Sequence, residues 1–273
     1  MKLILALFSF LLMYQANAQT TFDSKFPITS GYYSSFDGTK IYYEVRGQGK
    51  PVVLVHGFIV SGNSWKGSAL YKDLITGGYK VIILDMRGNG KSGKPHNEEA
   101  YERDAEARDI MGLTNYLSIK KYSVIGYSRG SIITARLLLL DKHIEDAVIG
   151  GMGTQFTNPE WPRRLMFYHA LIADTVRELK SLVAYVQHQH LDQLALAYLQ
   201  KYQPSASVKQ LHSIKQPVLV IRGDKDEYNV SAPELAKILP NSTYETTPGD
   251  HDHAYITPEF AKEVITFLRE HHY

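Results

Sequence analysis

Short apolar runs bounded by polar, glycine or proline residues recur along the sequence. They lie at 52–55, 81–84, 122–125, 147–149 and 218–221. A nearly uninterrupted apolar run of this length is typical of a strand that is buried on both faces of a parallel sheet. The pattern therefore predicts a parallel sheet of at least five strands as the centre of the fold.

Segments with helical periodicity lie between and after these runs. Residues 97–117 carry many charges with apolar residues at helical spacing, and residues 132–140 are apolar nearly all round. Residues 258–268 open with Pro258, a residue favoured in the first turn of a helix. Strands that alternate with helices imply right-handed crossovers. The predicted fold class is therefore α/β, with a doubly wound, mostly parallel central sheet.

A β-hairpin is predicted ahead of the first buried strand. Aromatic and β-branched residues at 32–36 and 39–45 flank Asp37 and Gly38. An Asp-Gly pair between two such runs is typical of a tight hairpin turn. The sheet is thus expected to begin with two antiparallel strands.

One long segment, from Met152 to His212, breaks the alternation because it has helical periodicity and no strand-like run. An insertion of this kind between two strands predicts a cap over the carboxyl ends of the strands, where such sheets bind ligands. The chain then divides into an α/β core, residues 19–151 and 213–273, and a helical cap insertion, residues 152–212. Most large side chains of the insertion are expected to form its own small core, while one or two could face a substrate. The large side chains in question are Trp161, Met166, Phe167, Tyr168, Tyr185 and Tyr198.

The first residues have the pattern of a signal peptide. Lys2 precedes an apolar stretch at 3–14, and Ala16-Asn17-Ala18 provides small residues at a cleavage site. We expect residues 1–18 to be removed and the protein to be exported, to the periplasm or to the medium, without stable membrane insertion afterwards. The alternative is an uncleaved anchor, although the stretch is shorter than the roughly 20 residues of a comfortable membrane span.

Composition excludes several other classes of function. The 273 residues are 44% hydrophobic and 21% charged, with a formal net charge of +2 and no cysteine. The absence of cysteine excludes disulfides, thiolate metal sites and a cysteine nucleophile. The small charge argues against nucleic acid as a partner, because phosphate binding needs a concentrated basic face. The oligomeric state cannot be predicted from these features.

A candidate nucleophile lies at the end of the third buried run. Gly-Tyr-Ser-Arg-Gly occupies 126–130, directly before the predicted helix at 132–140. The strand, turn and helix order is that of a nucleophile elbow, in which glycines allow a sharp turn and the serine lies at a helix N-terminus. The helix dipole there favours the negative charge that develops during attack. Ser128 is therefore predicted to be a nucleophile.

A serine hydroxyl needs a base, and the base needs an acid to orient it. A candidate base lies in the Gly-Asp-His-Asp-His segment at 249–253, and a candidate acid lies in the segment at 222–227. The chain order of serine, acid and histidine is the one expected of a catalytic triad whose serine lies in a nucleophile elbow. An alternative reading of 249–253 is a zinc site, but no His-Glu-x-x-His helix accompanies it, so no metal is expected.

At this point the sequence resembles the α/β-hydrolase family over nearly the whole chain after residue 18. Besides the elbow and the histidine segment, it has a His-Gly-Phe loop at 56–58, an Asp-x-Arg-Gly-x-Gly-x-Ser turn at 85–92 and a Gly-Asp-x-Asp turn at 223–226. The resemblance implies Asp226, rather than Asp224 or Glu227, as the acid, and His251, rather than His253, as the base. It also implies that the oxyanion hole is made by the backbone N–H groups of Phe58 and Arg129. Asp250 departs from the family, which commonly has a small residue beside the histidine.

The resemblance implies a carboxylesterase-like serine hydrolase that needs no cofactor. The expected substrates are small to medium, mainly apolar carboxylic esters, cleaved through an acyl-serine intermediate. The alternatives are another serine activity of this fold, such as perhydrolysis or hydrolysis of a C–C or amide bond, and a non-catalytic binding protein. His56 and Arg87 are expected to order loops rather than to act on a substrate.

Overall fold

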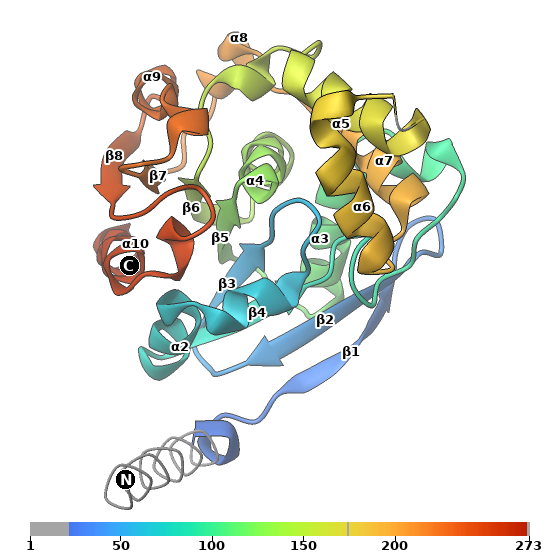
Figure 1. The fold of residues 1–273 in the computed structure, drawn as a ribbon. Helices are drawn as coiled ribbons and strands as arrows, with labels where there is room; N and C mark the ends of the chain where they lie inside the picture. The colour runs from blue at the N-terminus through green and yellow to red at the C-terminus, as the bar shows by residue number, and fades with distance from the viewer. Residues whose placement is uncertain (1–21, 174, 272–273) are drawn as a thin grey trace, which may run out of the picture.

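The computed structural model describes residues 22–173 and 175–271 (Figure 1). The predicted signal peptide at 1–18 lies outside the described residues. In the part of the chain that is described, no helix has both the length and the apolar character needed to cross a membrane.

An eight-stranded sheet forms the centre of the molecule. The strands are β1 (Thr29–Ser34), β2 (Lys40–Arg46), β3 (Lys50–Val55), β4 (Tyr79–Leu84), β5 (Tyr122–Tyr127), β6 (Ile144–Gly150), β7 (Val218–Gly223) and β8 (Ser242–Thr247). Their order in the sheet is β1-β2-β4-β3-β5-β6-β7-β8. The pairs β1/β2 and β2/β4 are antiparallel and all other pairs are parallel, so both the mostly parallel sheet and the hairpin predicted around Asp37 are confirmed.

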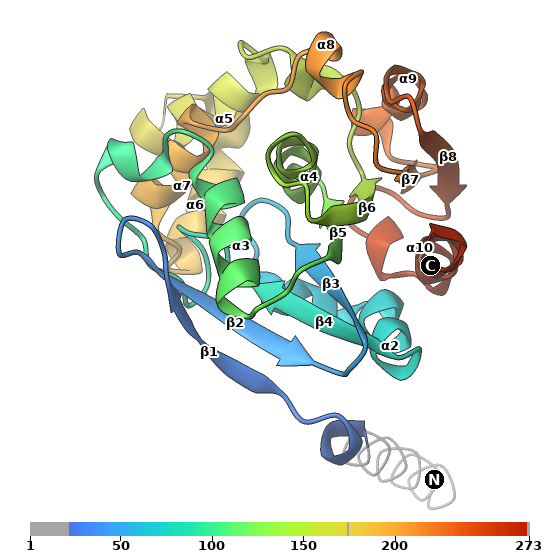
Figure 2. The same ribbon diagram turned by 180° about the vertical axis from the view of Figure 1, so that it is seen from behind.

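Helices cover both faces of this sheet (Figures 1 and 2). One face packs against α2 (Ala69–Thr76) and α10 (Pro258–His271), while the other packs against α3 (Ala105–Tyr116), α4 (Arg129–Leu140), α8 (Val208–Leu211) and α9 (Ala232–Ile238). Strand β3 shows how one apolar run serves both layers. Val53 and Val55 contribute to the cluster with α4, and Val52 and Leu54 contribute to the cluster with α2 and α10, because successive side chains point to opposite faces.

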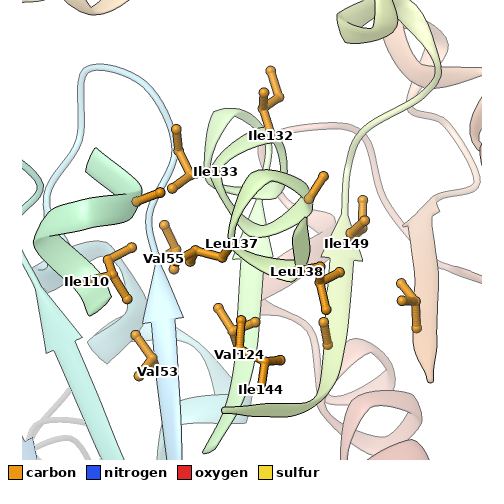
Figure 3. Close-up of a cluster of buried hydrophobic side chains, with 14 of the residues drawn as sticks. Val53, Val55, Ile110, Val124, Ile132, Ile133, Leu137, Leu138, Ile144 and Ile149 are labelled. Atoms are coloured by element: carbon orange, nitrogen blue, oxygen red, sulfur yellow. The ribbon is translucent and has the colours of Figure 1, made fainter. Parts of the chain in front are cut away.

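The side of the sheet that carries α4 holds the larger apolar cluster (Figure 3). Ile133 and Leu137 of α4 lie among Val53, Val55 and Val124 of the two central strands. All five side chains are fully buried. Burying an aliphatic side chain of this size contributes about 1.5–3 kcal/mol. The cluster therefore fixes α4, and with it the residue that precedes α4, against the sheet.

The structure differs from the sequence prediction at the helix expected at 97–117 and at strand β8, among other elements. The predicted helix at 97–117 is a 3₁₀ turn, η2 (Glu98–Tyr101), followed by α3, and Arg103 and Asp104 between them have positive φ angles of 54° and 59°. The left-handed backbone at these two residues interrupts the helix. Strand β8 was missed because it lies at the edge of the sheet, where its residues are mostly partly or fully exposed and no apolar run is needed.

The described residues between β6 and β7 form several helices joined by loops, with no strand among them. The helices are η3 (Gln155–Thr157), α5 (Pro162–Ala173), η4 (Arg177–Leu179), α6 (Lys180–His188), α7 (Gln193–Lys201) and α8. Leu171, Val186, Leu196 and Leu199 form a separate apolar cluster, against which Tyr168 and Tyr198 pack. We refer to α5–α7 and their connections as the helical insertion.

Candidate active site

Ser128 lies alone between the end of β5 and the start of α4. Its backbone is at φ 53° and ψ −124°, a conformation that non-glycine residues rarely adopt. A Cβ atom at Gly126 would come within 2.4 Å of the Gly130 carbonyl oxygen, and one at Gly130 within 2.2 Å of the Val55 carbonyl oxygen. Both positions therefore require glycine, and the turn presents the serine hydroxyl above the strand ends as a nucleophile elbow does.

Three side chains from distant parts of the sequence form one chain of hydrogen bonds. Nε2 of His251 lies 2.9 Å from Oγ of Ser128, and Nδ1 lies 2.9 Å from Oδ2 of Asp226. Ser128 follows β5, Asp226 follows β7 and His251 follows β8, so the carboxyl ends of parallel strands bring them together. In this arrangement Asp226 can hold the ring with Nε2 free to accept the serine proton.

The carboxylate of Asp226 is buried, with only 1% of the residue exposed. Burial by itself raises the pKa of Asp226. The hydrogen bond and charge of His251 and the hydrogen bond from Asn229 have the larger effect, so the pKa of Asp226 lies below its ordinary value of 3.8. Arg222 also donates to the Asp226 carbonyl oxygen at 3.1 Å. Sequence reasoning missed Asn229. Its only sequence signal is its place three residues after the acid, in a turn.

The structure separates Asp226 and His251 from the rejected alternatives. Oδ1 of Asp224 accepts the backbone N–H of Gly249 at 2.9 Å, which ties the acid turn to the histidine segment. Oδ1 of Asp250 accepts the N–H of Asp252 at 3.1 Å and that of His253 at 3.0 Å, and it pairs with the His253 ring at 2.6 Å. Asp250 thus shapes the exposed turn and pairs with His253.

The two predicted oxyanion-hole residues lie beside Ser128. Phe58 follows β3, the strand next to β5, and Arg129 is the first residue of α4, so its N–H is among the free donors of the helix. Both residues line the same cavity as Ser128. A Cβ atom at Gly57 would lie 3.4 Å from Cβ of Ser128, which shows how closely the loop after β3 approaches the elbow.

Two buried side chains hold the loops around this site. His56 donates from Nδ1 to the Gly57 carbonyl oxygen at 2.8 Å, and its Nε2 accepts the N–H of Met86 at 3.0 Å. Burial lowers the pKa of His56, in keeping with a neutral ring in this role. Arg87 donates to both carboxylate oxygens of Asp109 at 2.7 Å and 2.6 Å. The structure therefore places both residues as loop supports, as expected.

Two chambers meet at Ser128 and His251. The first, of about 340 Å³, lies under the helical insertion, and we call it the insertion chamber. Besides Ser128 and His251, its lining includes Phe58, Ile132, Met152, Trp161, Phe167 and Leu182. The second, of about 260 Å³, is aromatic, and its lining includes Trp65, Tyr127 and Tyr255. Of the large insertion residues, Trp161 and Phe167 face a chamber, whereas Tyr168 and Tyr198 pack in the insertion's own cluster and Tyr185 is exposed.

Comparison with known proteins also indicates the α/β-hydrolase fold. The family model for the alpha/beta hydrolase fold matches residues 50–184. A non-heme chloroperoxidase homologue from Synechocystis sp. is 39% identical over 98 residues, which span 36% of this chain and 34% of that protein. A non-heme chloroperoxidase from Streptomyces lividans is 28% identical over 256 residues, which span 80% of this chain and 91% of that protein.

A solved structure agrees over most of the chain. The bromoperoxidase from Bacillus anthracis superposes with a TM-score of 0.73 at 25% identity, covering 88% of this chain and all of that one. The matched region of the family model contains the loop after β3, the elbow and the start of the helical insertion. From the sheet order, the elbow and these matches, the chain has the α/β-hydrolase fold.

Proposed function

We propose that this protein is a serine hydrolase that cleaves carboxylic esters through an acyl-serine intermediate. The observation that carries the proposal is the continuous chain of hydrogen bonds from Ser128 through His251 to Asp226. A serine hydroxyl becomes a competent nucleophile only when a base accepts its proton and an acid stabilises the charged base. Ser128 lies within hydrogen-bond distance of His251, and His251 lies within hydrogen-bond distance of Asp226, which is the required order.

The reaction follows from this geometry. His251 accepts the proton of Ser128 as Oγ attacks the ester carbonyl carbon, and Asp226 stabilises the cationic ring. The N–H groups of Phe58 and Arg129 stabilise the negative oxygen of the tetrahedral intermediate, a contribution of about 100-fold or more in rate for each donor. His251 then protonates the leaving alcohol. Water, activated by His251, releases the acid and restores Ser128.

The two chambers support a small to medium ester substrate. They share Ser128 and His251, so an ester whose carbonyl carbon lies at Ser128 can place its acyl half in one chamber and its alcohol half in the other. A volume of about 340 Å³ is near the lower end of the range for small-molecule sites. The apolar and aromatic side chains in both linings favour a mainly apolar carbon skeleton.

The test is hydrolysis of p-nitrophenyl esters of increasing acyl length by the protein and by its Ser128→Ala variant. Turnover that is lost in the variant supports the proposal, and covalent labelling of Ser128 by a fluorophosphonate gives a readout independent of substrate choice. A folded protein that neither turns over any of these esters nor reacts with the fluorophosphonate would contradict it and favour a binding role.

Perhydrolysis is a second candidate, favoured by the similarity to proteins named non-heme chloroperoxidase and bromoperoxidase. The same acyl-serine can be attacked by hydrogen peroxide in place of water, which gives a peracid and free serine. This activity predicts peracid formation from a short ester and hydrogen peroxide, and its loss in Ser128→Ala. Ester hydrolysis with no peracid at millimolar peroxide would exclude it.

We also propose that the protein is exported after cleavage behind Ala18 and acts on small molecules, with no nucleic-acid partner and no stable membrane insertion. The basis is the signal-peptide pattern at 1–18 and the formal net charge of +2. N-terminal sequencing of the protein recovered from the periplasm or medium tests this point. A mature chain beginning at Gln19 supports it, whereas an uncleaved chain in the membrane fraction contradicts it.

A further inference from the structure

The insertion chamber carries an excess of positive charge on its insertion side. Three arginines, Arg129, Arg163 and Arg164, line it, whereas Asp252 is the only carboxylate residue in its lining and is exposed. Arg129 is neutralised by Glu106, which binds its guanidinium through two hydrogen bonds of 2.6 Å and 2.5 Å. The two arginines of α5 are therefore the source of the excess.

Arg164 is a buried cation held by neutral groups. Only 8% of the residue is exposed, and its terminal nitrogens donate to the carbonyl oxygens of Gln200, Lys201 and Pro159 at 2.6–2.8 Å. Its Nε is buried and has no hydrogen-bond partner within the described residues. Burial lowers the pKa of Arg164, because the charged form is disfavoured away from water. A buried charge without an opposite charge beside it, such as remains when one partner of a buried ion pair is removed, is strongly destabilising.

Arg163 lies in the first turn of α5 and contacts Tyr228, a residue of the α/β core. Its guanidinium lies 4.4 Å from the ring centroid of Tyr228 and 5.2 Å from that of Phe167. Both rings line the chamber. Stacking of this kind orients the planar guanidinium while leaving its N–H edge available for a planar anion. No ion pair of Arg163 occurs among residues 22–173 and 175–271.

We propose that the insertion chamber binds the half of the ester that carries a carboxylate, and that Arg163 and Arg164 recognise this group. The substrate class is then a monoester of a dicarboxylic acid, or an ester of a hydroxy acid, with a mainly apolar chain between the two functional groups. This inference rests on the proposed ester hydrolysis and deepens it. The proposed substrate carries one anionic end, and the apolar residues of the lining favour an apolar chain for the rest of it.

A purely structural role for Arg164 is the competing explanation. Its bonds to Gln200 and Lys201 satisfy carbonyl oxygens at the C-terminal end of α7, where a cation is favoured. That role accounts for the terminal nitrogens. It does not account for the position of a second arginine, Arg163, on the same chamber, nor for the unpartnered Nε in a wall that otherwise consists largely of apolar side chains.

Two matched pairs of esters test the proposal. p-Nitrophenyl hemiglutarate and p-nitrophenyl pentanoate differ by a carboxylate on the acyl side, and 4-acetoxybutanoate and butyl acetate differ by one on the alcohol side. The quantity measured is the ratio of kcat/KM within each pair, for the wild type, Arg163→Gln, Arg164→Gln and the control Arg177→Gln. Arg177 is an exposed arginine of the insertion that does not line the chamber.

We expect the anionic ester to be preferred in one pair, and the ratio to fall about 10-fold or more in R163Q or R164Q but not in R177Q, because a hydrogen bond between charged groups is lost. Ratios that change less than 2-fold in both variants, in both pairs, would overturn the proposal. If R164Q does not fold, the ratio of kcat/KM measured for R163Q alone decides between the two outcomes.

A binding measurement separates this inference from the proposed function. If the wild type cleaves none of the four esters, the ester proposal fails. Calorimetric titration of the wild type with glutarate then tests the arginine site by itself. Binding that weakens about 10-fold in R163Q and not in R177Q supports the site, and absent or unchanged binding overturns it.

Discussion

Asn229 donates its side-chain amide to both carboxylate oxygens of Asp226, at 3.1 Å to Oδ1 and 3.0 Å to Oδ2. Its own Oδ1 accepts the backbone N–H of Gly153 at 3.2 Å, so the amide is fixed from both ends. Gly153 follows β6 and Asp226 follows β7. Asn229 therefore holds the carboxylate of Asp226 beside His251 and ties it to the segment that follows the neighbouring strand.

Asn229→Ala should lower kcat about 10-fold, because a lost hydrogen bond to a charged group costs about 1.5–3 kcal/mol and part of this is lost in the transition state. The rate of Ser128 labelling by a fluorophosphonate should fall in parallel. Gln203→Ala is the control, since Gln203 lines the same chamber and no hydrogen bond joins its side chain to Asp226 among the described residues. A change in KM or melting temperature alone, with the labelling rate intact, would mean that Asn229 has only a packing role.

The pH dependence of stability should report the ionised state of Asp226. Because its folded-state pKa is held below 3.8 by His251 and Asn229 against the effect of burial, the carboxylate stabilises the fold above about pH 4. That contribution is lost as the pH falls through the folded-state pKa. The difference in free energy of unfolding between the wild type and Asp226→Asn, measured in urea, should therefore shrink between pH 7 and pH 3. A difference that stays constant over this range contradicts the assignment.

The sequence predicts best those parts of the fold that are buried on both faces. The five central strands appear as apolar runs because β3 to β7 pack against helices on both sides. Strand β8 has no such requirement, and helices α2 and α9 are short, so a window of residues carries little periodic signal there. The hairpin is predicted because Asp-Gly chemistry is local.

Some residues of the candidate site can likewise be predicted from local sequence, and others cannot. Ser128 is predicted from local geometry, since glycine is needed at 126 and 130 for the turn itself. The hydrogen bond of Asn229 with Gly153, the bonds of Arg164 with the end of α7 and the ion pair of Arg129 with Glu106 each join segments far apart in the sequence. No local pattern marks such partners, because an asparagine or arginine in a loop or helix is usually solvated. Only the fold reveals which of them are buried.

Glu106 forms a buried ion pair with Arg129, the residue that follows Ser128. Glu106→Gln should destabilise the protein by about 3 kcal/mol, because it leaves the buried charge of Arg129 uncompensated. The double variant Glu106→Gln/Arg129→Met should recover part of this loss, since it removes the unpaired charge as well. Urea unfolding of the wild type, the two single variants and the double variant measures the coupling. Additive losses would show that the two side chains do not act as a pair.

Gly130 should tolerate no side chain. In Gly130→Ala the new Cβ would meet the Val55 carbonyl oxygen at 2.2 Å, so α4 must move away from β3. We expect a loss of about 3 kcal/mol or more in stability, at the upper end of the range for overpacking. Gly67→Ala is the control, because a Cβ there meets nothing within 4 Å and should change stability by less than about 1 kcal/mol. Equal effects of the two substitutions would show that the elbow is not tightly packed against β3.

The backbone of Ser128 should store strain that a glycine releases. Its φ of 53° and ψ of −124° cost a non-glycine residue about 1–3 kcal/mol. Ser128→Ala keeps this cost and Ser128→Gly removes it, while glycine loses about 0.5–1 kcal/mol through the entropy of the unfolded chain. Ser128→Gly should therefore be more stable than Ser128→Ala by about 1 kcal/mol, although both lack the serine hydroxyl.

The opposite order is expected at Ser181, an exposed residue of helix α6 with no special backbone conformation. There Ser181→Gly should be less stable than Ser181→Ala by about 1 kcal/mol, because glycine is a poor helix former. Urea unfolding of the four variants compares the two positions under one set of conditions. If glycine is the less stable replacement at both, the backbone at 128 carries no excess energy. The sharp turn would then be maintained by the packing of Gly126 and Gly130 without a cost in stability at Ser128.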